Sequence, residues 1–341
     1  MVSGGEGEAR PSDSKLVDRY SRSLNYLRLS ITDRCNLRCA YCVPHMPVSK
    51  FLHSEILSYE EILRIVCVLS RLGIRKVRVT GGEPLVRKGV YDFLPKLCRV
   101  EGIDEVSLTT NGVMLEQNID QISAAGIRRI NVSLDTLDRE KYKRITGVDV
   151  LDRVLSALSA AKERGFSPIK INVVAIRGFN DDEIETLARL SMTEPFHIRF
   201  IEYMPIGKRR ADTGKKPLLA PEIAQRLSAI GRLIPVTRSH NDGPAQRFRF
   251  EGAVGEVGFI RPMSHHFCST CNRLRLTANG QLRTCLLSDR QEDLKGPMRA
   301  GCSDEALSEI IVAAARLKPL SHQLSDSAVS GVSSQMSSIG G

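Results

Sequence analysis

Tryptophan is absent from this 341-residue chain, and aromatic residues together make up only 5% of it. Proteins that hold single-stranded nucleic acids stack the bases on aromatic side chains, so this composition disfavours that class. The chain also lacks an apolar run of ~18 residues, the length that a membrane-spanning helix needs. Residues 1–23 lack the apolar centre of a secretory signal, and we expect them to form a short disordered leader on a cytoplasmic protein.

Acidic residues are outnumbered by basic ones, with 39 Asp and Glu against 49 Lys and Arg, which gives a net charge of +10. Such an excess predicts an anionic partner, either a nucleic acid or a polyphosphate. Because aromatic residues are scarce, we favour a small anion and expect no nucleic-acid or membrane partner.

Cysteine, in contrast, is plentiful: the chain has nine, an odd number that does not suit a framework of paired disulfides. In a cytoplasmic protein, cysteines more often bind metals or act as nucleophiles. Cys67 lies within the apolar run 65–69, where we expect a small buried side chain. Six others form two groups of three, which are Cys35, Cys39 and Cys42, and Cys268, Cys271 and Cys285.

Short β-branched runs alternate with amphipathic stretches at helical spacing over residues 24–203. The predicted strands are 26–32, 76–80, 105–109, 129–134, 170–175 and 197–202. The predicted helices between them include 60–71, 151–164 and 182–190. This βα repeat predicts a parallel sheet, either open and doubly wound or curled into a partial barrel. After a boundary at 205–217, we predict a smaller part with a helix at 222–230, strands at 246–250 and 255–260, and a helix at 304–316.

Polar and glycine-rich motifs directly follow three of the predicted strands. They are Thr80-Gly81-Gly82-Glu83-Pro84, Thr109-Thr110-Asn111-Gly112 and Ser133-Leu134-Asp135. In both kinds of parallel sheet, ligands bind at the carboxyl ends of the strands. The sequence therefore predicts a site at this end of the sheet.

The first cysteine group has the spacing CxxxCxxC and comes directly after the first predicted strand. Three thiolates are too few for a structural zinc ion, which takes four ligands, but they suit an iron–sulfur cube with one iron left open. The alternative is a zinc site made from the pairs Cys39/Cys42 and Cys268/Cys271. That site would leave Cys35 and Cys285 without a role.

The segment from Arg28 to Cys42, together with Gly81-Gly82-Glu83-Pro84, resembles the signature of the radical S-adenosylmethionine (SAM) superfamily. The resemblance implies a 4Fe-4S cluster whose open iron chelates SAM, so that one-electron reduction yields methionine and a 5′-deoxyadenosyl radical. It also implies an α/β fold, a partial (β/α)6 TIM-like barrel of the radical SAM type. The SAM pocket implied by it consists of Tyr41, Gly82, Ser133 and Met204.

The second cysteine group again supplies three thiolates and leaves one iron open. Its surroundings, residues 267–277 and 280–286, resemble the C-terminal motif of the GTP 3′,8-cyclases of molybdenum cofactor biosynthesis. Arg273 and Arg275 alternate on a predicted strand, so both guanidinium groups face the same side, where they can hold a phosphate.

The resemblance to the cyclase family covers Tyr26 to Gly341 and implies two 4Fe-4S clusters. The GTP contacts implied by it are Arg28, Arg78, Thr109, Lys170, Arg273 and Arg275, and the catalytic residues are Arg273, Arg275, Gly340 and Gly341. The expected domains are a leader at 1–23, the radical SAM barrel at 24–207, a C-terminal domain with the second cluster at 208–320, and a tail at 321–341. Composition alone predicts a frayed serine-rich tail, whereas the resemblance places its final Gly-Gly pair in the active site.

By the same resemblance, we expect a lyase that converts GTP to (8S)-3′,8-cyclo-7,8-dihydroguanosine 5′-triphosphate, the first step of molybdenum cofactor biosynthesis. The expected partners are a reductase or flavodoxin-type electron donor, the downstream cyclic pyranopterin monophosphate synthase and a second copy of the chain in a homodimer. Two other functions stay open. One is a radical SAM peptide-maturing enzyme with an auxiliary cluster, and the other is a zinc-stabilised nucleic-acid-binding protein.

Overall fold

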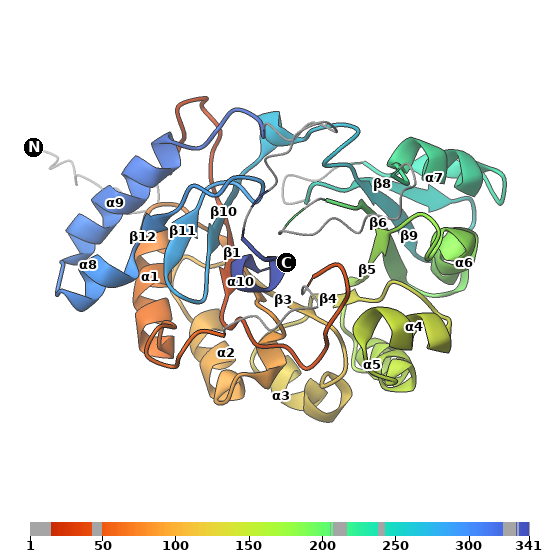
Figure 1. Ribbon diagram of the computed structural model, residues 1–341, viewed down its shortest axis with the longest axis horizontal. Helices are drawn as coiled ribbons and strands as arrows, with labels where there is room; N and C mark the ends of the chain where they lie inside the picture. The colour runs from red at the N-terminus through yellow and green to blue at the C-terminus, as the bar shows by residue number, and fades with distance from the viewer. Residues whose placement is uncertain are drawn as a thin grey trace, which may run out of the picture.

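The structure is a computed structural model that describes residues 15–42, 50–204, 206, 217–237, 243–322, 332 and 334–340. These residues form one sheet of twelve strands in the order β12-β11-β10-β1-β2-β3-β4-β5-β6-β9-β8-β7. The sheet curves without closing on itself, and helices cover its outer side (Figure 1). Among the residues described, no helix has the length and apolar character needed to cross a bilayer.

Strands β1 to β6 run parallel and follow one another through helical crossovers. The strands are β1 (Tyr26–Ser30), β2 (Lys76–Thr80), β3 (Glu105–Thr110), β4 (Ile130–Ser133), β5 (Ile169–Ala175) and β6 (Phe196–Glu202). The helices are α1 (Tyr59–Arg71), α2 (Val90–Cys98), α3 (Ile119–Ala124), α4 (Arg139–Thr146), α5 (Leu151–Glu163) and α6 (Ile184–Thr193). The predicted α/β partial barrel is confirmed, and each predicted strand agrees with the observed one to within two residues at either end.

Helix α1 illustrates how the sequence builds the outer layer. The Ser58 hydroxyl accepts the Glu61 N–H at 3.1 Å, and the Glu61 carboxylate accepts the Ser58 N–H at 2.7 Å, which is a complete capping box. The stripe that packs inward consists of Ile62, Ile65, Val66, Val68 and Leu69. Cys67 was predicted to be buried, but this prediction is wrong: Cys67 is exposed. Helical periodicity turns its side chain away from the stripe although its neighbours in sequence are apolar.

The C-terminal part extends the same sheet at both edges. β9 pairs with β6 in parallel, and β8 and β7 follow in antiparallel order. At the other edge, β10 pairs with β1 in parallel, and β11 and β12 follow in antiparallel order. The bounds are β7 (Leu233–Pro235), β8 (Gln246–Phe250), β9 (Glu256–Ile260), β10 (Arg273–Leu276), β11 (Gln281–Arg283) and β12 (Glu292–Asp293).

Four further helices belong to this part: α7 (Ala220–Ser228), α8 (Lys295–Arg299), α9 (Asp304–Arg316) and α10 (Met336–Ile339). Helices α7, α8 and α9 lie on the outside of the sheet, whereas the short α10 lies within its curve, near β1 and β10 (Figure 1). The segment that ends the described chain is therefore inside the barrel.

Residues 15–23 were predicted to belong to a disordered leader, and for this segment the prediction is wrong. Leu16 is 4% exposed, its N–H donates to the Leu72 carbonyl at 2.8 Å, and its carbonyl accepts the Leu24 N–H at 2.8 Å. Asp18 and Arg22 form a buried ion pair with Nε and Oδ2 2.6 Å apart. One apolar anchor and one paired charge thus order a segment whose overall composition is polar. Residues 1–14 lie outside the described part of the chain.

Alternate side chains of the strands point into the interior of the barrel instead of toward the helices. On β1, Leu27 and Leu29 face the helices and are fully buried, whereas Arg28 lies on the opposite face. The strand register places Arg28 beside Arg275 of β10 and Arg78 of β2. The interior is therefore lined by charged side chains, which requires a reason beyond folding.

Candidate active site

The first cysteine group lies at the carboxyl end of the barrel strands, in the loop after β1. This loop packs on the turn after β2, where the Gly82 N–H donates to the Thr32 carbonyl at 2.7 Å and the Glu83 N–H to the Arg34 carbonyl at 2.8 Å. A Cβ at position 82 would lie 2.2 Å from the Arg34 carbonyl oxygen, so only glycine fits there. Part of the Gly-Gly-Glu-Pro motif thus holds the cysteine loop in place.

The three thiols of this group are partly buried and close enough to influence one another. Burial raises the pKa of Cys35 and Cys39, and it raises the pKa of Cys42 to about 12. The Leu37 N–H and the Asn111 side-chain amide approach the Cys35 Sγ at 3.4 and 3.7 Å. Crowded thiols of high pKa become thiolates when a metal binds, and N–H groups directed at sulfur are typical of iron–sulfur sites. The donor set therefore fits a three-cysteine cluster.

Glu83 places a buried carboxyl group beside the first cysteine group. It is 1% exposed and accepts hydrogen bonds from the N–H groups of Leu85 at 3.1 Å and Asn111 at 2.6 Å, and from the Thr110 hydroxyl at 2.8 Å. Burial nevertheless raises the pKa of Glu83 to about 7. A cation bound nearby would favour the ionised carboxylate.

Asp135 is a second buried carboxyl group at the same end of the barrel. It is 6% exposed, and it accepts the Tyr41 hydroxyl at 2.7 Å and the Val174 N–H at 2.8 Å. Burial raises the pKa of Asp135 to about 6. Burial and then the charge of Asp135 raise the pKa of Tyr41 well above its usual value, so Tyr41 stays protonated as the donor.

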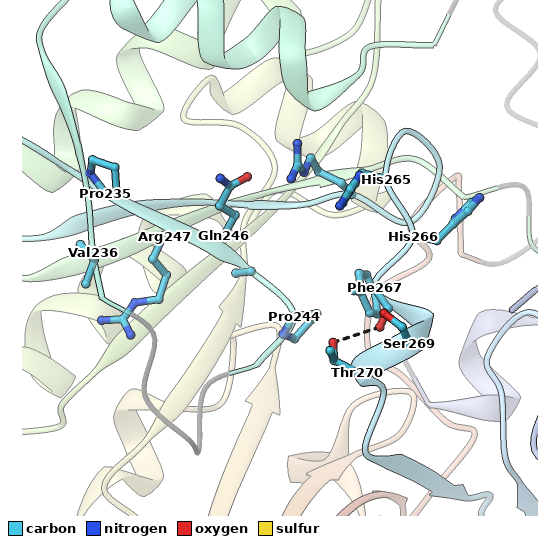
Figure 2. Close-up of a pocket in the computed structure, with 12 residues that line it drawn as sticks. Pro235, Val236, Pro244, Gln246, Arg247, His265, His266, Phe267, Ser269 and Thr270 are labelled. Atoms are coloured by element: carbon cyan, nitrogen blue, oxygen red, sulfur yellow. Dashed lines mark hydrogen bonds between the residues drawn. The ribbon is translucent and has the colours of Figure 1, made fainter. Parts of the chain in front are cut away.

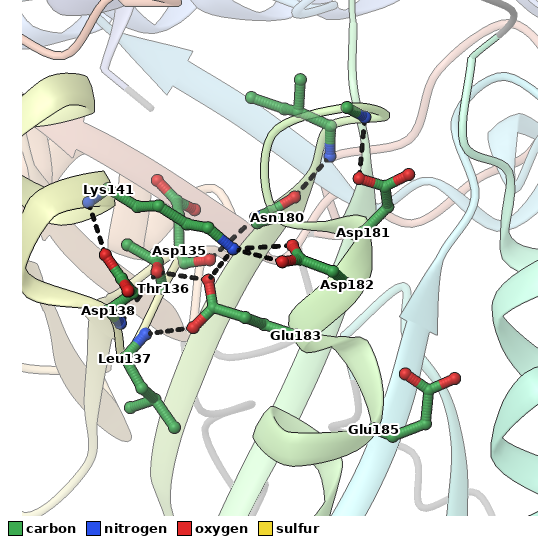
Figure 3. Close-up of polar contacts among 12 residues, drawn as sticks. Asp135, Thr136, Leu137, Asp138, Lys141, Asn180, Asp181, Asp182, Glu183 and Glu185 are labelled. Atoms are coloured by element: carbon green, nitrogen blue, oxygen red, sulfur yellow. Dashed lines mark hydrogen bonds and ion pairs between the residues drawn. The ribbon is translucent and has the colours of Figure 1, made fainter.

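A polar network fixes the turn that carries Asp135 (Figure 3). The Asn180 side-chain amide donates to the Asp135 carbonyl at 2.8 Å. The Glu183 carboxylate accepts the Leu137 N–H at 3.0 Å and lies 3.2 Å from the Lys141 Nζ. These contacts join the loops after β4 and β5, so the turn that carries Asp135 is held by groups from both.

The second cysteine group lies at the opposite end of the same strands. Cys271 stands two residues before Arg273, the first residue of β10, which pairs with Tyr26 at the start of β1. Cys285 follows β11, which runs antiparallel to β10 and so returns to the same end. Cys35, in contrast, comes after the end of β1, whose five residues span roughly 17 Å.

This arrangement contradicts the alternative of one zinc ion shared by two CxxC pairs. Thiolates of a zinc site all lie about 2.3 Å from the metal, and the pairs Cys39/Cys42 and Cys268/Cys271 lie at opposite ends of β1. Among the residues described, no three His, Cys, Asp or Glu side chains converge on one point as they would around a single ion. A cube needs no such convergence, because each thiolate binds a different iron.

Cations surround the second cysteine group. Burial alone would raise the pKa of Cys271, but the charges of Arg273 and Lys318 lower it to about 6. Arg22 donates from Nη1 to the Cys268 carbonyl at 2.6 Å. These cations favour the Cys271 thiolate, whereas burial raises the pKa of Cys268.

Between the two groups, buried cations line the barrel. Burial lowers the pKa of Arg28 to about 10 and that of Arg275 well below its usual value. Burial, followed by repulsion from Arg199 and Arg78, lowers the pKa of Lys170 to about 6. Buried groups that weaken one another's positive charge indicate a place where an anion binds.

The strand register places the six residues predicted to contact GTP on the interior face, where two buried polar atoms lack a partner within the described part of the chain. The Thr109 Oγ1 and the Tyr26 hydroxyl are buried without a hydrogen-bond partner among the described residues, although buried polar atoms usually have one. A hollow of about 30 Å³ is lined by Tyr26, Lys76, Arg78, Lys170, Arg199 and Asn272.

The C-terminal segment closes one side of this interior. Gly340 is buried, and its carbonyl accepts a hydrogen bond from Arg275 Nη1 at 2.5 Å. Its φ of +76° favours glycine, and a Cβ there would lie 3.0 Å from side-chain atoms of Ser30 and Thr80. Gly341, the other half of the predicted pair, lies outside the described residues.

A second contact holds the same segment further back. Arg283, which is 1% exposed, donates to the Ser334 hydroxyl at 2.7 Å, and Ser334 in turn donates to Asp289 at 3.0 Å. Met204, predicted to contact SAM, packs with Ile339 in a small apolar cluster. Residues 334–340 are therefore packed, unlike the frayed tail that composition predicts.

A larger cavity of about 390 Å³ lies between β8 and the loop before the second cysteine group (Figure 2). Its described lining contains none of the predicted site residues. Arg247, one of its cations, is already paired with Glu256 at 2.7 Å. Other lining residues are Gln246, Arg261, His265, His266 and Phe267. We therefore place the site in the barrel interior instead.

Comparison with known proteins agrees with this geometry. The Radical SAM superfamily model matches residues 29–191, and the Molybdenum Cofactor Synthesis C model matches residues 196–324. The GTP 3′,8-cyclase of Thermodesulfovibrio yellowstonii is 49% identical over 89% of this chain and 94% of its own length. That of Moorella thermoacetica is 48% identical over 91% of this chain and 95% of its own. The chain belongs to the GTP 3′,8-cyclase family.

Among solved structures, Streptococcus suis SuiB bound to S-adenosylmethionine resembles this cyclase-family chain with a TM-score of 0.56 and 15% identity. The match covers 79% of this chain and 63% of SuiB, and at this identity it shows the fold alone. Membership in the radical SAM superfamily gives the chain SAM and an iron–sulfur cluster as cofactors.

Four side chains that shape the two cysteine sites were not predicted. Glu83 and Asp135 stand in motifs that follow strands, so a signal for them existed in the sequence. Arg22 and Lys318 carried no such signal, because their contacts join segments far apart in the chain. Such long-range contacts are visible only once the topology is known.

Proposed function

We propose that this cyclase-family chain is a lyase that converts GTP to (8S)-3′,8-cyclo-7,8-dihydroguanosine 5′-triphosphate in the first step of molybdenum cofactor biosynthesis. The observation that carries the proposal is the buried cationic interior between two three-cysteine groups. A triphosphate supplies the negative charge that these side chains need. The names of the relatives support the same reaction.

At the carboxyl end of the strands, Cys35, Cys39 and Cys42 would hold a 4Fe-4S cluster. SAM would lie against it, among Tyr41, Gly82, Ser133 and Met204. When bound, cluster and SAM supply the 5′-deoxyadenosyl radical, which takes the ribose 3′ hydrogen to become 5′-deoxyadenosine and so allows C3′ to join C8 of guanine. One further electron, from the donor proposed below, and a proton complete the dihydroguanine ring. Glu83 and Asp135 suit SAM because its sulfonium is positive.

At the other end, Cys268, Cys271 and Cys285 would hold a second 4Fe-4S cluster, with its open iron directed at the guanine. The triphosphate and ribose would be bound by Arg28, Arg78, Thr109, Lys170, Arg273 and Arg275. Gly340 would fix the Arg275 guanidinium through the hydrogen bond described above, and Gly341 would act with it as the second catalytic glycine.

A carbon radical reacts with most C–H bonds and with oxygen, so the reacting atoms need a closed chamber. The barrel wall and the C-terminal segment would provide it, with Gly340 packed against Ser30 and Thr80. We further propose a cytoplasmic enzyme that takes electrons from a reductase or flavodoxin-type donor and passes its product to cyclic pyranopterin monophosphate synthase, as a monomer or a homodimer.

The proposal is tested with anaerobically reconstituted, reduced protein and SAM, by measuring 5′-deoxyadenosine with GTP, with ATP or without nucleotide. We expect GTP alone to stimulate turnover. Equal turnover in all three cases would mean that the chain is a radical SAM enzyme that acts on another substrate, such as a peptide. It would contradict GTP as the substrate.

A further inference from the structure

Lys318 is a buried lysine just beyond the end of α9, with 2% of its surface exposed. Its Nζ donates to the Arg273 carbonyl at 2.9 Å and to the Thr284 carbonyl. Arg273 stands two residues after Cys271, and Thr284 stands directly before Cys285. One ammonium group thus ties together the two segments that carry these cysteines.

The charges near Lys318 are unusual for a buried lysine. Burial lowers its pKa, and the groups that oppose this shift are the thiolates of Cys271 and Cys285. Arg22, which reaches the same loop, differs because it has the carboxylate of Asp18 at 2.6 Å. A buried ammonium is costly without an anion, so the thiolates are the natural partners of Lys318.

We propose that Lys318 is a positioning residue that neutralises the second iron–sulfur cluster and stabilises its reduced form. The proposal rests on the second cluster proposed above. When a mediator reduces the cube, one electron passes to the cluster and makes it more negative by one charge. A fixed ammonium beside two of its ligands favours that state and raises the reduction potential.

The test is a redox titration, followed by electron paramagnetic resonance, on the full-length chain with Cys35, Cys39 and Cys42 changed to serine. In this background only the second cluster can form. The variants are Lys318→Met and Lys318→Gln, which lose the charge, and Lys318→Arg, which keeps it. Lys318→Gln retains a side-chain hydrogen-bond donor, so the test remains possible if Lys318→Met fails to fold. Lys295→Met is the matched control, because Lys295 also donates to a carbonyl, that of Glu55 at 2.7 Å, but at the surface.

We expect both neutral variants to shift the one-electron equilibrium toward the oxidised cluster at least tenfold, which corresponds to about 59 mV. Lys318→Arg and Lys295→Met should leave the potential near that of the parent. An intact cluster with an unchanged potential in Lys318→Gln would overturn the assignment of Lys318 while leaving the second cluster in place. A parent protein that binds no iron at this site would refute the second cluster and the role of Lys318 with it.

Discussion

The two cysteine groups of this chain carry the same three thiols but sit in opposite electrostatic environments. Beside the first group, the buried carboxyl groups of Glu83 and Asp135 lie close, and the thiol pKa values are raised. Beside the second group, burial raises the pKa of Cys268 as well, but the charges of Arg273 and Lys318 lower that of Cys271 to about 6. The barrel thus has one end that suits a cation and another that suits an anion.

This difference shows how one chamber can bind two substrates at separate ends. SAM carries a sulfonium and an amino group, whereas GTP carries a triphosphate, so each is attracted to a different end. It also predicts that the two proposed clusters differ in potential. Carboxylates would oppose the added electron at the first cluster, and ammonium and guanidinium groups would favour it at the second, so the first should have the lower potential.

The largest expected effect comes from removing one ligand at each end. Cys39→Ser should reduce 5′-deoxyadenosine formation to background, because SAM loses its cluster. Cys271→Ser should lose GTP conversion but retain the SAM cleavage that the parent shows without nucleotide. 5′-Deoxyadenosine and the cyclised nucleotide are both measured by chromatography after anaerobic reconstitution. Iron content and circular dichroism serve as controls for cluster assembly and folding. If Cys271→Ser lost SAM cleavage as fully as Cys39→Ser, the two ends would not have separate roles.

A smaller effect is expected from Arg275→Ala at the cationic end. Loss of a charged hydrogen-bond donor costs about 1.5–3 kcal/mol, which corresponds to a decrease of roughly 10- to 150-fold in kcat/KM for GTP. The KM for SAM should stay the same. Arg232→Ala is the control, because Arg232 is exposed and forms a surface pair with Glu251 at 3.7 Å, which contributes little. An equal loss in both variants would contradict a specific role for Arg275.

At the other end, Tyr41→Phe removes the hydroxyl that Asp135 accepts at 2.7 Å. Leaving the buried Asp135 Oδ2 without this donor costs about 1–3 kcal/mol, and we expect the KM for SAM to rise while the KM for GTP stays constant. Tyr59→Phe is the matched control, since the Tyr59 hydroxyl bonds to the exposed Lys88 carbonyl at 3.1 Å. A rise in the KM for GTP alone would place Tyr41 at the wrong end of the chamber.

The smallest expected effect is the number of protons that the protein takes up when it binds GTP. Because the pKa of Lys170 is lowered to about 6, this side chain is neutral near pH 8. A bound triphosphate raises that pKa, so GTP binding should take up as much as about one proton near pH 8 and none near pH 5, where Lys170 is already charged. Calorimetry in two buffers of different ionisation enthalpy measures the uptake, which Lys170→Met should abolish. Uptake unchanged in Lys170→Met would assign the proton to another group.

Much of this architecture could be predicted from the sequence, because strand periodicity and the motifs after the strands are local signals. These local signals were sufficient to predict the six barrel strands and helix α9. The packed leader could not be predicted, since it depends on Leu16 meeting α1 and on the single Asp18–Arg22 pair. Cys67 was mispredicted because an apolar run was given more weight than the helical phase.

The charge contrast between the two ends also could not be predicted from the sequence. It depends on the contacts of Arg22 and Lys318 with the second cysteine group, which join segments far apart in the sequence, and on burial, which shifts the pKa of Glu83, Asp135 and Lys170. The sequence identifies the ligands by their spacing, but the topology decides which charges surround them.

The most direct test of this contrast uses two full-length variants, each left with only one group of three cysteines. Electron paramagnetic resonance of the reduced protein is recorded after adding SAM alone or GTP alone. The account predicts that SAM perturbs only the cluster of Cys35, Cys39 and Cys42, and that GTP perturbs only the cluster of Cys268, Cys271 and Cys285. A GTP response at the first cluster, or a SAM response at the second, would contradict it.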